Sequence, residues 1–194
     1  MKKISMWPIL AILAGVGCNS PKEAPPKDLA LLTVKTDEVS VSRGAYLVNT
    51  IGCADCHSPK MMSDHGFVVD PARNLSGHPS DEGVPEAFNQ GIEGVLLFNM
   101  HGTAQKGPWG VSFAANITPD ETGIGSWTEE QFLTAIKKGK YKGLEGSRSL
   151  LPLMPWEYYR NLTDADIKSI FAYLKTVTPV DNVVPPPIPP AGVH

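Results

Sequence analysis

One short motif constrains this chain more than any other feature of its sequence. Two cysteines are separated by two residues and the second is followed directly by a histidine, as Cys53-Ala-Asp-Cys56-His57. The third cysteine of the chain, Cys18, lies far away in the sequence. Thiols at this spacing beside an imidazole are typical of a redox pair, a zinc site or a haem-attachment site. The surrounding sequence has to distinguish these three chemistries.

The context favours covalent attachment of haem. A thioredoxin-like redox pair needs a βαβ pattern around it, which the sequence lacks. A structural zinc site needs a second spaced pair of ligands, and three cysteines in total leave no second pair. In a c-type site the two thiols bond to the vinyl groups of haem, and the adjacent histidine is the fixed axial ligand. We therefore expect one covalent haem c on Cys53 and Cys56, with His57 as an iron ligand.

The beginning of the sequence reads as an export signal. Two lysines precede an apolar run over residues 4–16, which is too short to span a bilayer comfortably. Cys18 follows where a bacterial lipoprotein carries its lipid-modified cysteine, although Gly15 stands where a large aliphatic residue is usual. We expect residues 1–17 to be a signal peptide and Cys18 to be lipidated, with ordinary cleavage or an uncleaved anchor as alternatives. The protein would then be an exported lipoprotein of the bacterial envelope, anchored in a membrane and facing the periplasm.

Length and composition indicate one domain with long loops. The chain has 194 residues, of which 42% are hydrophobic, and it contains 18 glycines and 18 prolines. With a net charge of −3, the chain is not expected to have the basic surface that binds nucleic acid. Residues 18–40 lack periodicity and read as a flexible tether, and residues 41–178 form the body. The proline-rich residues 179–194 cannot be helical, so they form either an arm along the body or a loose tail.

Three helices are predicted within the body. The first covers residues 42–51, where apolar residues recur at three-and-four spacing. The second begins at Thr128 with a capping-box sequence and stops at Gly139. The third begins at Thr163, with acidic residues in its first turn. Residues 58–127 read mostly as turns and no strand is predicted, so the expected class is all-α, with loop-rich helices around one haem.

The second axial position of the iron decides between an electron carrier and a catalyst. An open position can bind peroxide or another small molecule, whereas a methionine sulfur closes it and raises the reduction potential. Met154 is the favoured ligand, because Pro152 and Pro155 bracket it and stiffen its loop before the last helix. Met100 is the alternative methionine, and core filling is the ordinary role for either.

The remaining candidates for this position are less favourable. Met61 and Met62 follow His57 so closely that the extended chain, about 14 Å at most, barely passes the edge of the haem. Four histidines are also candidates, namely His65, His78, His101 and His194. For the first three, contact with solvent or an ordinary loop hydrogen bond is the favoured interpretation.

Three segments of the body resemble class I bacterial cytochromes c. They are RGAYLVNTIGCADCHSP from Arg43, NITPDETGIGSWTEEQFLTAIKKG from Asn116 and LPLMPWEYYRNLTDADIKSIFAYLK from Leu151. The segment from Asn116 is similar to modules in the cytochrome subunits of periplasmic alcohol and aldehyde dehydrogenases. Those subunits usually carry three haem modules, whereas this chain has one motif for haem attachment.

The resemblance implies the cytochrome c fold, in which the first and last helices cross in front of the haem pocket. Gly44 would then lie near Phe171 and Leu174, and the family's Met-Pro pair matches Met154-Pro155. The family's Pro-x-Leu-x-Gly region is similar to PARNLSG, so the carbonyl of Pro71 is expected to orient His57. Six residues are candidates for contact with haem propionates or the pocket, with plain packing as an equal alternative: Trp109, Asn116, Trp127, Arg148, Trp156 and Tyr158.

The expected function is that of a mono-haem, membrane-tethered electron carrier. Its partners would be redox proteins, such as a periplasmic dehydrogenase, other cytochromes or a terminal oxidase. The alternative is a haem enzyme with an open or labile sixth position, of the peroxidase-like or sulfur-oxidising kind. Four lysines near the end of the second helix are either an ordinary solvated face or a patch that steers an acidic partner: Lys137, Lys138, Lys140 and Lys142.

Overall fold

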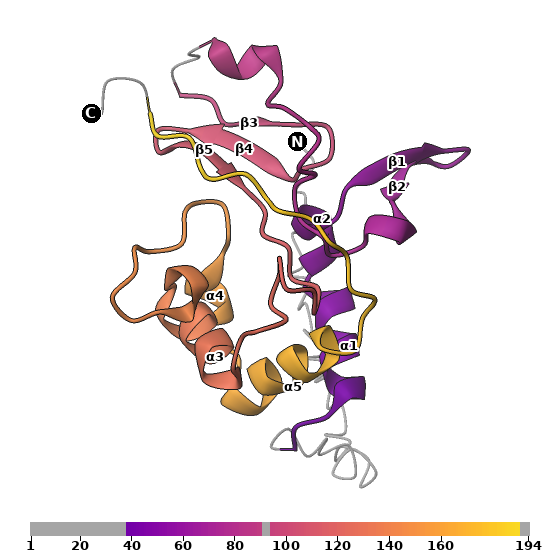
Figure 1. Cartoon of the computed structure of the whole chain (residues 1–194), viewed down its shortest axis with the longest axis vertical. Helices are drawn as coiled ribbons and strands as arrows, with labels where there is room; N and C mark the ends of the chain where they lie inside the picture. Colours follow the sequence, from indigo (N-terminus) through magenta and orange to yellow (C-terminus); the bar gives the residue numbers. More distant parts are fainter. Residues whose placement is uncertain (1–37, 91–93, 191–194) are drawn as a thin grey trace, which may run out of the picture. The chain divides into compact units, whose positions relative to one another are not determined.

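The computed structural model describes residues 38–90 and 94–190 of the chain (Figure 1). The predicted signal peptide, Cys18, nearly all of the predicted tether and His194 lie outside these residues. Among the described residues, no helix combines the length and apolar character needed to cross a membrane.

All three predicted helices are present, and two short ones accompany them among the residues that the structure describes. The helices are α1 (Val41–Thr50), α2 (Cys53–His57), α3 (Glu129–Lys138), α4 (Trp156–Tyr159) and α5 (Asp164–Leu174). Three 3₁₀ turns cover Pro71–Arg73, Glu86–Asn89 and Tyr141–Gly143. Thr128 caps α3 in a complete capping box with Gln131, and Gly139 ends this helix at φ 61°. Thr163 caps α5 by accepting the Asp166 N–H.

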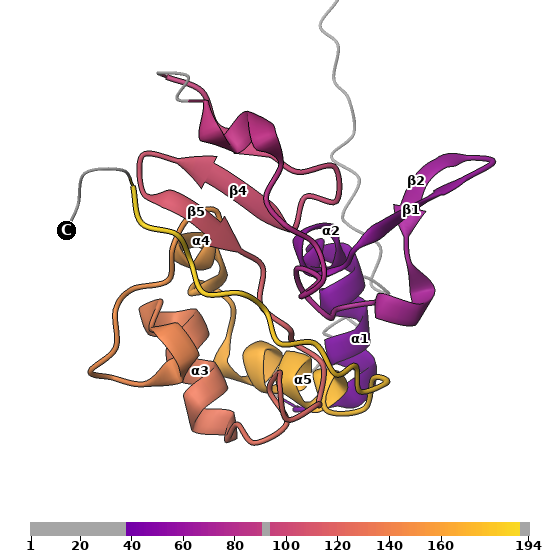
Figure 2. The same ribbon diagram turned by 45° about the horizontal axis from the view of Figure 1, so that its top comes forward.

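The expectation of an all-α protein is wrong, because the described part of the long region between α2 and α3 contains two small antiparallel sheets. One pairs β1 (Lys60–Ser63) with β2 (Gly66–Val69). The other has the order β3 (Leu97–Phe98), β4 (Ala104–Gly107) and β5 (Gly110–Phe113). These strands are two to four residues long, which is too short for an alternating pattern to be recognised. Tight turns join β1 to β2 and β4 to β5, and both views show the β1–β2 hairpin projecting from the helices (Figures 1 and 2).

The first and last helices pack against each other through a glycine, as the cytochrome resemblance implies. A Cβ atom on Gly44 of α1 would overlap the carbonyl oxygen of Ser169 and lie 2.8 Å from the Cβ of Tyr173, both on α5. The two helix backbones therefore touch at this point. The serine side chain adds a second link, because its hydroxyl accepts the Ser40 N–H at 3.1 Å.

Within the described part of the chain, two hydrophobic clusters form the interior. The larger one joins the buried faces of the three long helices to two loop residues, Leu75 and Ile124. Its buried members are Leu47, Val48, Leu75, Ile124, Phe132, Ile167, Ile170 and Leu174. The smaller one lies beside the three-stranded sheet and consists of Phe88, Ala104 and Val111. The helical part and the sheet part of the fold thus each have a core.

The proline-rich end of the chain lies along the body over residues 179–190, rather than extending away from it (Figure 2). Asn182 is buried, and its side chain donates to the carbonyls of Ser76 and His78 at 2.7 and 2.9 Å. Further along, Ile188 forms an antiparallel bridge with Val111 of β5. This arm therefore connects the segment after the Pro71–Arg73 turn to the second sheet.

The crossing of α1 and α5 yields a test in which two physical effects have opposite signs. Helix propensity alone predicts that Gly44→Ala stabilises the protein by about 1 kcal/mol. Because the new methyl group would overlap the α5 backbone, we expect a loss of about 1–3 kcal/mol instead. Guanidinium unfolding of the haem-loaded protein measures the difference. Gly146→Ala is the matched control, since a Cβ there meets nothing within 4 Å; a more stable Gly44→Ala variant would contradict the crossing.

Candidate functional site

The two cysteines of the motif lie on one face of the short helix α2. Residues three positions apart in a helix are neighbours on its surface, so Cys53 and Cys56 present their thiols together. Neither forms a disulfide bond; Cys53 is half-buried and Cys56 is exposed. Burial raises the pKa of Cys53 to about 11 and also raises the pKa of Cys56. A redox-active pair requires a lowered thiol pKa, so this environment does not favour the thioredoxin-like alternative.

The histidine of the motif is held by a backbone carbonyl from a distant segment. His57 Nδ1 lies 2.7 Å from the carbonyl oxygen of Ala115, and because a carbonyl only accepts, Nδ1 donates. Burial lowers the pKa of His57, which favours the neutral imidazole. The proton of that neutral ring is on Nδ1, so the lone pair on Nε2 is available to a metal. The ring therefore has the tautomer and the fixed orientation that iron ligation requires.

The carbonyl that orients His57 belongs to Ala115 and not to Pro71, so that expectation is wrong. Pro71 begins a 3₁₀ turn, and the PARNLSG segment contributes instead through its last residue. Gly77 donates its N–H to the His57 carbonyl at 2.8 Å. A Cβ on Gly77 would lie 2.5 Å from the Ala115 carbonyl carbon, and its φ of 80° is one that glycine adopts readily. Gly77 thus lets the two segments around His57 approach each other.

The NITP motif shapes the turn that presents this carbonyl. The buried side chain of Asn116 accepts the Thr118 N–H at 2.9 Å and its hydroxyl at 2.8 Å, an arrangement typical of an Asx turn. The same side chain donates to the carbonyl of Val180 in the C-terminal arm at 2.8 Å. The motif is visible in the sequence, and Ala115 stands directly before it. Nothing in the sequence marks the Ala115 carbonyl as the partner of His57, because an alanine side chain carries no chemical signal.

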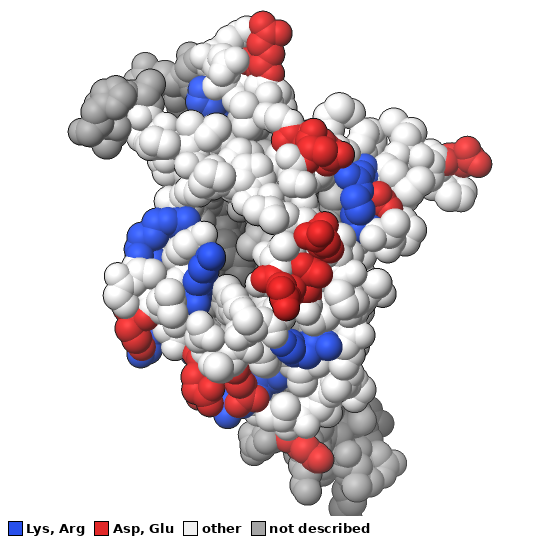
Figure 3. Space-filling model, viewed as in Figure 1, with Lys and Arg blue, Asp and Glu red and all other residues white. Residues whose placement is uncertain are grey.

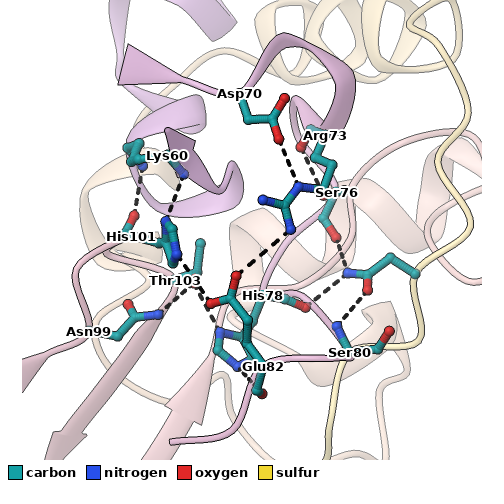
Figure 4. A network of polar contacts seen from close by, with 11 residues as sticks. Lys60, Asp70, Arg73, Ser76, His78, Ser80, Glu82, Asn99, His101 and Thr103 are labelled. Atoms are coloured by element: carbon teal, nitrogen blue, oxygen red, sulfur yellow. Dashed lines mark hydrogen bonds and ion pairs between the residues drawn. The ribbon is translucent and has the colours of Figure 1, made fainter. Parts of the chain in front are cut away.

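A lysine that sequence reasoning missed caps the end of α2. The Lys60 ammonium donates to the carbonyls of Asp55 and Ser58 at 2.5 and 2.8 Å, and to that of His101 at 2.8 Å. A cation near the last carbonyls of a helix interacts favourably with its dipole. Lys60 therefore connects the end of the motif helix to the turn after β3 (Figure 4).

Two of the candidate histidines are engaged elsewhere in this polar network (Figure 4). His78 is fully buried, and its ring nitrogens lie 3.0 Å from Thr103 Oγ1 and 3.2 Å from the Glu82 carbonyl. His101 accepts the Lys60 N–H at Nδ1, at 2.9 Å, and its Nε2 lies 3.2 Å from a Glu82 carboxylate oxygen. With both nitrogens of each ring occupied, neither histidine presents a free lone pair to iron in this arrangement.

Four further candidates for the second axial position lie on exposed surface. Met61 and Met62 are on β1, 44% and 65% exposed, and Met100 is 76% exposed in the turn after β3. His65 is exposed in the turn between β1 and β2. These positions differ from that of Met154, which is half-buried in the loop before α4.

The loop of Met154 is held at both ends. Before it, Leu150 donates its N–H to the Gly139 carbonyl at the end of α3, at 2.7 Å. After it, the Tyr159 hydroxyl donates to the Ile51 carbonyl at 3.0 Å, just before α2. Burial, followed by the nearby charges of Cys53 and Cys56 when ionised, raises the pKa of Tyr159, so its hydroxyl stays protonated. The loop is therefore tied to the segment that leads into the motif.

The six predicted pocket residues have different environments. Asn116 is buried in its turn, and Trp127 packs against the larger core. Trp156 packs on Gly139, where any Cβ would overlap its ring. The remaining three make surface or sheet contacts: Trp109 donates to Ser112, Arg148 stacks 4.0 Å over the Tyr141 ring, and Tyr158 is 77% exposed.

The four lysines near the end of α3 do not form a free positive patch. Lys137 pairs with Asp164 at 2.9 Å and Lys138 with Glu145 at 2.5 Å. Lys140 is half-buried and reaches the Ser147 carbonyl at 3.4 Å, and Lys142 is exposed. Figure 3 shows basic side chains at the left of a recess in this face and acidic ones at its right. Pairing of Lys137 and Lys138 favours the ordinary solvated interpretation over steering of a partner.

Comparison with known proteins gives the family of this arrangement. The cytochrome c family model matches residues 41–178. The cytochrome subunit of fructose dehydrogenase from Gluconobacter japonicus is 34% identical over 148 residues, which are 75% of this chain and 23% of that protein. The gluconate 2-dehydrogenase cytochrome c subunit from Pantoea cypripedii is 29% identical over 166 residues, 82% of this chain and 29% of that protein.

A third relative shows a shorter match. One of the subunits of nicotinate dehydrogenase from Pseudomonas putida is 40% identical over 88 residues, which are 45% of this chain and 7% of that protein. The chain thus spans less than a third of the length of each of these three relatives. The family match includes all five helices and the Cys-x-x-Cys-His motif. These matches show that the chain belongs to the cytochrome c family.

Proposed function

We propose that this chain is a mono-haem, membrane-tethered electron carrier of the bacterial envelope, which passes single electrons from a dehydrogenase-type donor to an acceptor. The family and the dehydrogenase cytochrome subunits among the relatives indicate an electron-transfer protein with covalently bound haem c. The carrier role depends on the second axial position being closed by a protein ligand. The observation that supports it best is the contrast between Met154, in its anchored loop, and the other candidates within residues 38–90 and 94–190, which are hydrogen-bonded or exposed.

The residues of α2 fit a covalent haem. Two thiols on one helix face match the two thioether bonds of haem c, and neither is engaged in a disulfide. His57 follows them with Nδ1 donating to a carbonyl, which leaves Nε2 for iron. Within residues 38–90 and 94–190, no cluster of three or more His, Cys, Asp or Glu side chains offers a competing metal site. When bound, haem supplies the Fe(III)/Fe(II) couple.

Met154 would complete the proposed site by supplying the second protein ligand to the iron. A thioether is a neutral ligand that favours a carrier with a raised reduction potential. The protein's contribution is to keep this side chain in place through the anchors at Gly139 and Ile51. Under this proposal the closed position does not admit peroxide, which distinguishes the carrier from the enzyme alternative.

The membrane location and the donor are proposed from the sequence and the relatives. A lipid on Cys18, followed by the tether over residues 18–40, would leave the haem domain free to move at the membrane surface. A chain of about twenty flexible residues has a root-mean-square length of roughly 25 Å. A dehydrogenase is the proposed donor, because several relatives are named as cytochrome subunits of such enzymes.

Haem attachment is tested by changing the two cysteines singly and together. We expect the mature wild-type chain, made with cytochrome c maturation machinery, to carry the mass of one haem on the peptide containing Cys53 and Cys56. Each single Cys→Ala variant should form one thioether bond at most, which shifts the pyridine haemochrome spectrum toward the b-type. The double variant should lose covalent haem altogether. A haem mass on any other peptide of the wild-type chain would contradict the assignment.

The Met154 assignment is tested by Met154→Ala. We expect the ferric wild-type protein to show the weak far-red charge-transfer band of a methionine–iron bond, and the variant to lose it. The midpoint potential of the variant should fall, since the neutral sulfur ligand stabilises the ferrous state. Met100→Ala is the matched control, because that side chain is exposed. Loss of the band in Met100→Ala and its retention in Met154→Ala would refute the assignment.

Membrane tethering is tested by Cys18→Ser. The protein should be recovered with membranes in its wild-type form and in the soluble periplasmic fraction as the variant. The haem spectrum of the two forms should be the same, because Cys18 takes no part in the proposed haem site. Equal fractionation of both forms would disprove the lipid anchor, and mass spectrometry of the mature amino terminus would then show which signal cleavage occurs.

A further inference from the structure

A hydrogen-bond relay from the second sheet reaches the loop that carries Met154. The hydroxyl of Ser112, on β5, donates to the carbonyl of Pro152, two residues before the methionine. The indole N–H of Trp109 donates to the same hydroxyl at 3.1 Å. A hydroxyl has one proton to give and accepts from others, so the tryptophan bond leaves the serine proton for the carbonyl. Ser112 is only 6% exposed, which shields the relay from competing water.

The relay starts from a rigid base. Trp109 lies in the turn between β4 and β5, and its ring packs over Gly107, where any Cβ would overlap it. The neighbouring residue of Ser112, Val111, is bridged to Ile188 of the C-terminal arm, with N···O distances of 2.7 and 2.9 Å. The donor side of the relay is therefore fixed by the β4–β5 hairpin and by the arm. The acceptor side is a loop without regular structure between Ser149 and Trp156.

We propose that Ser112, oriented by Trp109, is a positioning residue for Met154. This inference rests on the proposed ligation of iron by that methionine. The hydrogen bond to Pro152 restricts the loop two residues before the thioether, and the Tyr159–Ile51 bond restricts it five residues after. A thioether is a weak ligand that foreign ligands displace once the loop opens. Ser112 thus determines how often the sixth position of the iron becomes accessible to foreign ligands. A position that rarely opens is that of an electron carrier, and one that opens often is that of a ligand-binding haem protein.

The experiment measures binding of imidazole to the ferric, haem-loaded protein, followed by loss of the far-red methionine–iron band. Ser112→Ala removes the donor to Pro152, so the loop should open more often and the apparent affinity for imidazole should rise about two- to tenfold. Trp109→Phe retains the serine proton and should cause a smaller rise. In Met154→Ala the position is already open, so adding Ser112→Ala to it should change the affinity no further.

A matched control separates positioning from a general loss of stability. Ser169→Ala also removes a buried serine hydroxyl, which bonds to Ser40 and Ala165 at the crossing of α1 and α5. This control should lower the unfolding midpoint and leave the affinity for imidazole unchanged. An equal rise in affinity in Ser169→Ala and Ser112→Ala would mean that the serine acts only through overall stability, and would overturn the proposal.

Two further outcomes distinguish this inference from the proposed function. An unchanged affinity in Ser112→Ala, with a large increase in Met154→Ala, would refute positioning and leave Met154 as the ligand. If the wild-type protein lacks the far-red methionine–iron band, and Met154→Ala does not alter its affinity for imidazole, both Met154 ligation and Ser112 positioning are refuted. If Ser112→Ala does not mature with haem, the Trp109→Phe variant is measured in its place. An affinity of Trp109→Phe for imidazole equal to that of the wild type would then overturn the proposal.

Discussion

The hydrogen bond from His57 Nδ1 to the Ala115 carbonyl is the contact on which the proposed site depends. It joins the motif helix to a segment nearly sixty residues away and fixes the ring with Nε2 free. The surrounding features serve this contact: Gly77 allows the two backbones to approach, and the Asn116 turn presents the carbonyl. The arm strengthens the turn through Val180. Two segments of the loop-rich region between α2 and α3, around Gly77 and around Asn116, thus meet at this imidazole.

The opposite side of the proposed site is built from loops tied to regular structure. The Met154 segment bonds to the end of α3, to β5 and to Ile51, two residues before the motif helix. The link between Tyr159 and Ile51 connects the segments that would supply the two axial ligands. The crossing of α1 and α5 at Gly44 fixes the helix that leads into the motif helix, since α2 begins three residues after α1 ends.

The parts of the fold with strong local signals were predicted from the sequence, and the parts decided by distant contacts were not. Capping residues such as Thr128 and Gly139 located the helix ends, because caps satisfy backbone groups locally. The strands were missed because they are short and are stabilised by pairing rather than by pattern. The Ala115 carbonyl replaced the expected one of Pro71, since any residue offers a carbonyl and only the fold selects which one. Lys60 was missed for the same reason, as its partners are three main-chain oxygens.

Nuclear magnetic resonance of the ferrous, haem-loaded protein tests the central contact most directly. With ¹⁵N-labelled histidine, the Nδ1 proton of His57 should be protected from exchange with solvent and show nuclear Overhauser contacts to Ala115 and Asn116. Its Nε2 should carry no proton, as expected for the atom that binds iron. A rapidly exchanging Nδ1 proton, or one whose contacts are to Pro71 and Ala72, would contradict the account.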